Sequence, residues 1–193
     1  MRSVADIFRS YAVFDSEGRH VNGTDKESNH RYGAAYEDIL TIQNPAPHSI
    51  RGDVLLMMEV GIADGSSLLA WREVFPNALC VGMDIHHSDK AHGERIEFHL
   101  GDQCSQADCE RAASGRWFDF ICEDATHILG NTLLTLYWLW PFVKLGGLYV
   151  IEEWDGVGGN RGRIEELFND AEIIGTCGPN MRDEPLVVLR KST

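Results

Sequence analysis

The sequence lacks the cysteine pattern of a disulfide-bonded or zinc-binding protein. It has five cysteines, an odd number, and no Cys-x-x-Cys pair. A disulfide framework needs paired cysteines, and thiolate zinc sites usually take their ligands in closely spaced pairs. Cys80 and Cys122 lie in apolar runs, where a cysteine serves as a small core residue. Since the N-terminus also lacks the apolar core of a signal peptide, we expect a reduced, cytoplasmic setting.

Long apolar runs and positive charge are scarce as well. The longest apolar stretch, residues 133–143, is too short to span a bilayer, which takes ~20 residues, and it predicts a buried helix. Seventeen Lys and Arg stand against thirty Asp and Glu, a net charge of -13. That charge repels a phosphate backbone, and no basic run is present to attract an anionic membrane. We therefore expect neither nucleic acid nor a membrane as a partner.

What the sequence does contain is an ordinary globular composition. Its 193 residues, 44% of them hydrophobic, suit one domain with a real core. Residues 1–50 are polar and weakly periodic, which predicts an N-terminal extension that covers the ligand site, with one helix over residues 32–42. Residues 51–193 are predicted to form the ligand-binding and catalytic domain.

From Asp53 onward, short apolar runs alternate with amphipathic segments, as in a parallel sheet covered on both faces. Strands are predicted over residues 54–60, 79–84, 96–100, 118–123 and 148–152, and helices over 66–75, around Lys90, and over 106–114, 129–143 and 161–169. Gly146 and Gly147 are expected to break the fourth helix before the fifth strand. The last two apolar runs, 171–175 and 186–189, are joined by a Gly/Pro-rich segment and should pair antiparallel. The expected fold is α/β, Rossmann-like and doubly wound, and its terminal hairpin argues against a dehydrogenase.

The first predicted strand ends in the segment Glu59-Val-Gly-Ile-Ala-Asp-Gly65, and a helix follows it. A tight turn at a helix N-terminus lets a ligand approach the backbone closely. The pattern is E-x-G-x-A-x-G instead of G-x-G-x-x-G, which favours a ligand with an amino acid portion and a nucleoside over a dinucleotide. Glu59, Gly61, Ala63 and Gly65 are therefore candidate ligand-binding residues.

Further polar residues follow the next two strands. Asp84, with Ile85, lies where a ribose hydroxyl pair is commonly held, and Asp102-Gln103 lies where an adenine edge would be. Each has a structural alternative, since the glycines serve turns and Asp84 can cap a loop. Their joint occurrence at strand carboxyl ends favours a nucleoside site.

A cluster of carboxylates is predicted at the same edge of the sheet. Asp124 follows the fourth strand, and Glu152 and Glu153 follow the fifth. Neighbouring strands lie about 5 Å apart, so these side chains can share a hard cation such as Mg²⁺. His127 stands three residues after Asp124 and is a candidate general base. The alternatives are solvated carboxylates and a helix-capping histidine.

Four aromatic residues near the end of the fourth predicted helix form a stripe. They are Tyr137, Trp138, Trp140 and Phe142. The stripe predicts either a buried core or a contact between copies of the chain in a homo-oligomer.

Several of these motifs, in their order and spacing, resemble the Mg²⁺-dependent sugar O-methyltransferases of macrolide and aminocoumarin biosynthesis. The resemblance is carried by Asp25-Lys26, His30-Arg-Tyr32 and residues 59–68, 71–72, 75–77, 82–85, 101–103, 118–127 and 145–153. It implies a class I methyltransferase fold with a seven-stranded, mostly parallel sheet.

The resemblance also implies ligands and roles for the candidate residues. S-adenosylmethionine (SAM) would be held by the turn at residues 59–65, by Asp84 and by Asp102-Gln103. Asp124, Glu152 and Glu153 would be metal ligands, and His127 would act with Asp124 in catalysis. The expected activity is O-methylation of a small-molecule hydroxyl acceptor, such as a sugar or a glycosylated natural product. A metal-independent methyltransferase and a SAM-binding module without catalysis are the alternatives.

Overall fold

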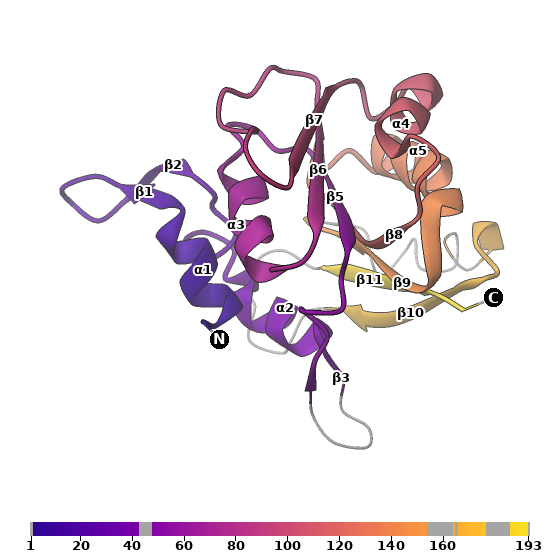
Figure 1. Cartoon of the computed structure of the whole chain (residues 1–193), viewed down its shortest axis with the longest axis horizontal. Coiled ribbons are helices and arrows are strands. Elements are labelled where there is room, and N and C mark those ends of the chain that lie inside the picture. Colours follow the sequence, from indigo (N-terminus) through magenta and orange to yellow (C-terminus); the bar gives the residue numbers. More distant parts are fainter. Residues whose placement is uncertain (1, 43–47, 154–163, 165, 177–185, 193) are drawn as a thin grey trace.

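A computed structural model describes residues 2–42, 48–153, 164, 166–176 and 186–192. A seven-stranded sheet forms the centre of the molecule (Figure 1). Its strands are β5 (Leu56–Val60), β6 (Leu79–Asp84), β7 (Ile96–Leu100), β8 (Phe118–Glu123), β9 (Val143–Ile151), β10 (Ala171–Thr176) and β11 (Val187–Lys191). They lie in the order β10-β11-β9-β8-β5-β6-β7.

Strands β5 to β9 run parallel to one another, and β10 and β11 form the antiparallel end of the sheet. The predicted α/β fold with seven mostly parallel strands and a terminal antiparallel pair is confirmed. Strand β9 differs from its prediction because it begins at Val143 and continues through Gly146 and Gly147. The two glycines therefore lie within a strand, where they were expected to end a helix.

Three of the predicted helices follow the strands as expected. They are α3 (Ser66–Val74), α4 (Gln106–Ala113) and α5 (Leu129–Leu139). Helix α5 ends earlier than predicted and continues as a 3-10 turn, Trp140–Phe142, because Pro141 cannot donate a backbone hydrogen bond to the preceding turn. The helix predicted around Lys90 is wrong, since residues 85–95 form bends and turns. The helix predicted over 161–169 lies partly outside the described residues.

The N-terminal residues contain more structure than the sequence predicted. Helix α1 (Val4–Ser10) precedes a hairpin of β1 (Ala12–Phe14) and β2 (His20–Gly23), and α2 (Tyr32–Ile39) and the short pair β3 (Thr41–Ile42) and β4 (His48–Ser49) follow. Ser3 caps α1 by accepting a hydrogen bond from the N–H of Asp6. Val4, Ile7 and Phe8, spaced at i, i+3 and i+4, are buried. The amphipathic face of α1 thus packs into the core.

The sheet separates two hydrophobic clusters. One lies under α1, α2 and α3, and the other lies under α4 and α5 (Figure 1). Phe120 and Ile121, neighbours on β8, point to opposite faces and belong one to each cluster. Cys80 and Cys122 are buried as predicted, and Cys177 lies outside the described residues. None of the helices that the structure describes has the length and apolar character needed to cross a bilayer.

Candidate active site

A cavity of about 410 Å³ lies where the carboxyl ends of the parallel strands meet. Open parallel sheets commonly bind ligands at this edge. Nine residues predicted from the sequence to belong to the site line this cavity: Gly61, Ala63, Asp84, Ile85, Asp102, Gln103, Asp124, His127 and Glu153. Gly23, Thr24 and Asp25 add a wall from the N-terminal segment. The cavity is of a size typical of small-molecule sites.

The turn between β5 and α3 forms one side of the cavity. Gly61 has a φ of +82°, and a Cβ at this position would lie 2.2 Å from the carbonyl oxygen of Asp124. Asp84 fixes the turn from the next strand, since its Oδ2 accepts hydrogen bonds of 2.9 Å from the N–H groups of Ile62 and Ala63. The close approach of two backbones at Gly61 therefore requires a glycine.

Glu59 and Gly65, at the two ends of this segment, are not among the residues that line the cavity. Glu59 is fully buried, and its carboxylate accepts hydrogen bonds from Ser67 Oγ at 2.8 Å and Trp71 Nε1 at 3.0 Å. Burial raises the pKa of Glu59 above its usual value. Of the four turn residues predicted to bind the ligand, the structure thus exposes Gly61 and Ala63 to the cavity.

Asp102 and Gln103 lie at the end of β7, but their side chains differ in what they contact. The Gln103 Nε2 donates to Glu123 at 3.2 Å and to Thr135 at 2.9 Å, and its Oε1 accepts from the N–H of Thr126 at 3.1 Å. Gln103 therefore ties the ends of β7 and β8 to α5. Asp102 is exposed at the cavity and accepts a hydrogen bond from a neighbouring backbone N–H through Oδ1.

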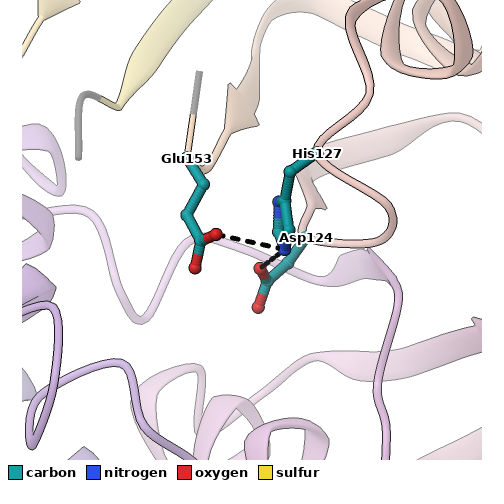
Figure 2. Close-up of side chains that lie close together, drawn as sticks. All are labelled: Asp124, His127 and Glu153. Carbon is teal, nitrogen blue, oxygen red and sulfur yellow. Dashed lines mark ion pairs between the residues drawn. The ribbon is translucent and has the colours of Figure 1, made fainter. Parts of the chain in front are cut away.

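Asp124, His127 and Glu153 lie together at the ends of β8 and β9 (Figure 2). His127 Nε2 is 3.3 Å from Glu153 Oε2 and 3.9 Å from Asp124 Oδ1. One potential ligand atom from each residue lies within 4.8 Å of the others, a spacing that suits a metal ion. His127 and Glu153 both have left-handed backbone, with φ of 56° and 55°. Such strain in non-glycine residues is often found at functional sites.

Glu152 comes directly after the end of β9 and does not belong to this group of three. Its Oε1 accepts hydrogen bonds from the Tyr36 hydroxyl and from Cys122 Sγ, and its Oε2 lies 2.7 Å from Lys26 Nζ. The structure therefore brings together Asp124, His127 and Glu153 and leaves Glu152 among buried partners behind them.

Lys26 and His30 contact the carboxylates, although no role was predicted for either residue. Lys26 is 1% exposed, and its Nζ lies 2.6 Å from Asp124 Oδ2. Burial lowers the pKa of Lys26, but the nearby Asp124 and Glu152 charges raise it well above its usual value. His30 Nε2 is 3.3 Å from Glu153 Oε1. The one sequence signal for these contacts was the occurrence of both residues in the motifs that carry the resemblance.

Two neighbouring carboxyl groups at the end of β8, those of Glu123 and Asp124, have raised pKa values. Burial, and then the charge of Glu152, raise the pKa of Asp124 to about 8, against the opposing effect of Lys26. Burial raises the pKa of Glu123 to about 7. Burial thus disfavours the charged form of Asp124, and a cation bound beside it would favour that form and lower its pKa.

Comparison with characterised proteins identifies the chain's relatives. It is 32% identical over 124 residues, 57% of its length, to the demethylmacrocin O-methyltransferase of Streptomyces fradiae. It is 30% identical over 140 residues, 68% of its length, to the 8-demethyl-8-alpha-L-rhamnosyl tetracenomycin-C 2'-O-methyltransferase of Streptomyces olivaceus. Its homologues are sugar O-methyltransferases. The matches cover 31% and 35% of these two relatives, so the chain spans about a third of their length. No known protein-family profile matches the chain.

A solved structure shows the same fold. The MycE methyltransferase from the mycinamycin biosynthetic pathway, in complex with Mg, SAH and mycinamycin VI, superposes with a TM-score of 0.74 at 19% identity. The match covers 99% of this chain and 54% of that one. The fold is thus that of the class I methyltransferases, as the motif resemblance implied.

Proposed function

We propose that the chain transfers a methyl group from SAM to a hydroxyl of a sugar or a glycosylated natural product, with the help of Mg²⁺. The observation that carries this proposal is the continuity of one cavity. The turn at Gly61, the strand-end Asp84 and Asp102, and the group of Asp124, His127 and Glu153 all line it. The homologues named as sugar O-methyltransferases support the reaction type.

SAM would lie against the β5–α3 turn, where the backbone approaches the ligand closely. Asp84 holds the turn through Oδ2, and its Oδ1 accepts from the N–H of His86 at 2.8 Å. Each carboxylate oxygen has two lone pairs, and Oδ2 already accepts two bonds, so one lone pair of Oδ1 is left for a ribose hydroxyl. Asp102, exposed at the end of β7, would meet the adenine edge. We propose that Ile85, 63% exposed at the cavity, gives the adenine an apolar contact.

The side chains of Asp124 and Glu153 offer ligand atoms that suit a hard divalent cation. Asp124 and Glu153 offer carboxylate oxygens, the ligands that Mg²⁺ prefers, and leave the remaining positions to water and acceptor oxygens. When bound, the cation would lower the free energy needed to deprotonate an acceptor hydroxyl. The relative of known structure was solved with Mg and SAH, which supports both cofactors.

His127 would act as the general base in this arrangement. Its Nε2 faces the cavity between the two carboxylates and would take the hydroxyl proton as the oxygen bonds to the methyl carbon. Asp124 and Glu153 stabilise the positive charge that the imidazole then carries. The products are a methyl ether and S-adenosylhomocysteine, with the proton on His127.

The acidic surface, with a net charge of -13, supports a small-molecule acceptor over a nucleic acid. A cytoplasmic location and a homo-oligomeric state remain proposals that rest on the sequence alone.

The test is transfer from methyl-labelled SAM to a panel of glycosides, with Mg²⁺ and with EDTA. We expect labelled product with Mg²⁺ and none with EDTA. Transfer that survives EDTA would support a metal-independent methyltransferase, and SAM binding without transfer to any acceptor would support a non-catalytic module.

A further inference from the structure

Lys26 lies at the centre of three carboxylates that come from three different strand ends. Its Nζ is 2.6 Å from Asp124 Oδ2, 2.7 Å from Glu152 Oε2 and 3.2 Å from Glu59 Oε1. The ammonium donates hydrogen bonds to Asp124 and Glu152 and forms an ion pair with Glu59. Lys26, Glu59 and Glu152 have side chains that are at most 1% exposed. The ammonium is therefore an internal cation of the site.

The three carboxylates differ in whether they keep an oxygen that could bind a cation. Both oxygens of Glu152 are engaged, by Lys26 on one side and by Tyr36 and Cys122 on the other. Both oxygens of Glu59 are also engaged, by Ser67 and Trp71. Asp124 alone gives one oxygen, Oδ2, to Lys26 and keeps Oδ1 toward His127.

We infer that Lys26 is a positioning residue that selects the metal ligands: it holds Glu152 and Glu59 away from the cavity and turns one oxygen of Asp124 toward His127 and Glu153. The inference rests on the metal-assisted function proposed above and deepens it. Without the ammonium, the carboxylates of Glu59, Asp124 and Glu152 would repel one another and compete for any cation in the cavity.

Lys26 also joins the N-terminal segment to the sheet. Gly23, Thr24 and Asp25, just before it, line the cavity, while its own side chain reaches the ends of β5, β8 and β9. The same contacts that select the ligands thus fix the cavity wall formed by this segment.

The test measures binding of Mn²⁺ alone to the whole chain by paramagnetic resonance. Glu152→Gln should bind Mn²⁺ within about threefold of the wild type, because Glu152 is already engaged, while Glu153→Gln should bind at least about tenfold more weakly. A loss in Glu152→Gln as large as that in Glu153→Gln would overturn the inference.

The opposite effect is expected when the internal cation is removed. Lys26→Met should bind Mn²⁺ about tenfold more tightly, since a nearby positive charge is lost and Glu152 is released. The gain should vanish in Lys26→Met/Glu152→Gln and should not occur in Lys26→Arg, which keeps the charge. Weaker or unchanged Mn²⁺ binding by folded Lys26→Met would contradict the proposal. If Lys26→Met does not fold, the Glu152→Gln result decides.

Lys144→Met provides a matched control. Lys144 Nζ is 2.6 Å from Asp119 Oδ1, the same distance as the Lys26–Asp124 pair, but it lies at the opposite end of the sheet. Its replacement should leave Mn²⁺ affinity unchanged, and a change as large as that in Lys26→Met would show that the effect is not specific to the site.

A wild type that binds no Mn²⁺ would refute the proposed metal function. The interaction between Lys26 and Glu152 is then tested by its effect on stability. Thermal unfolding in EDTA of Lys26→Met, Glu152→Gln and the double variant forms a cycle. We expect the double variant to lose less stability than the sum of the single losses. Additive losses would overturn the role of Lys26 even if the metal site is real.

Discussion

Glu153 and His127 contact each other through Oε2 and Nε2, 3.3 Å apart, and both residues adopt left-handed backbone. Each follows the end of a parallel strand, β9 in one case and β8 in the other. The two strained turns aim the side chains at each other over the cavity. A carboxylate in this position fixes the orientation of the imidazole and stabilises its protonated form.

Replacement of His127 by Asn should lower kcat by about 100-fold or more, the usual loss when a general base is removed. Asparagine tolerates the left-handed backbone at this position, so the fold should survive. Steady-state methyl transfer and SAM titration measure the two effects, and SAM affinity should not change. His92→Asn, at an exposed position, is the control. Activity within a few-fold of the wild type would remove His127 from the mechanism.

Loss of one metal ligand should raise the Mg²⁺ requirement. Glu153→Gln replaces a charged oxygen ligand by a neutral amide, so we expect the Mg²⁺ concentration for half-maximal transfer to rise at least about tenfold. Initial rates over a Mg²⁺ series, started from EDTA-treated protein, measure this. Glu110→Gln on the exposed face of α4 removes the same charge and should leave the requirement unchanged. Equal Mg²⁺ curves for wild type and Glu153→Gln would contradict the ligand assignment.

Gly61→Ala should destabilise the fold and abolish SAM binding. The new Cβ would lie 2.2 Å from the Asp124 carbonyl oxygen, and φ is +82°, so about 3 kcal/mol of unfolding free energy should be lost. Gly130→Ala is the matched control. Gly130 lies in α5, and nothing is within 4 Å of an added Cβ, so stability should stay equal or rise by up to about 1 kcal/mol. Chemical denaturation measures both, and equal stabilities of the two variants would refute the close approach at Gly61.

The Glu97–Arg116 pair predicts a pH-dependent contribution to stability. Two hydrogen bonds from Arg116, of 2.8 and 2.7 Å, lower the pKa of Glu97 to about 2, although partial burial opposes them. Because the folded-state pKa lies below the unfolded one, the stabilisation is present above about pH 4.5 and is lost as pH falls toward 2. The pair is about a third exposed, so screening limits its contribution to about 1 kcal/mol.

Glu97→Gln should therefore lower the free energy of unfolding by about 1 kcal/mol at pH 7, and the difference from wild type should shrink between pH 5 and pH 3. Urea denaturation at several pH values measures this. The same exchange at the exposed Glu94 should have little effect at any pH. A difference that grows as the pH falls would have the wrong sign for this account.

The strands were predicted well because buried parallel strands are continuous apolar runs. β6, β7 and β8 have the bounds that the pattern gave, and the residues after each strand reach one cavity because parallel strands share a carboxyl end. The placement of Asp84, Asp102, Asp124 and His127 followed from that geometry. Helix α1 was missed because it is short and its stability comes from tertiary contacts, such as the burial of Phe8.

The orientation of individual carboxylates could not be predicted from spacing. Glu152 and Glu153 are neighbours in the sequence, yet one faces Lys26 and the other faces His127. Which of the two points into the cavity depends on strand register and on the left-handed turn at Glu153. Lys26 was not identified because a lysine is rarely buried unless it is paired, and its partners lie far away in the sequence.

Calorimetric titration of the whole chain with SAM measures whether the cavity at the strand ends binds this ligand. We expect saturable binding to the wild type, lost in Gly61→Ala and kept in Gly130→Ala. Absence of SAM binding by a folded wild type, with or without Mg²⁺, would contradict this expectation.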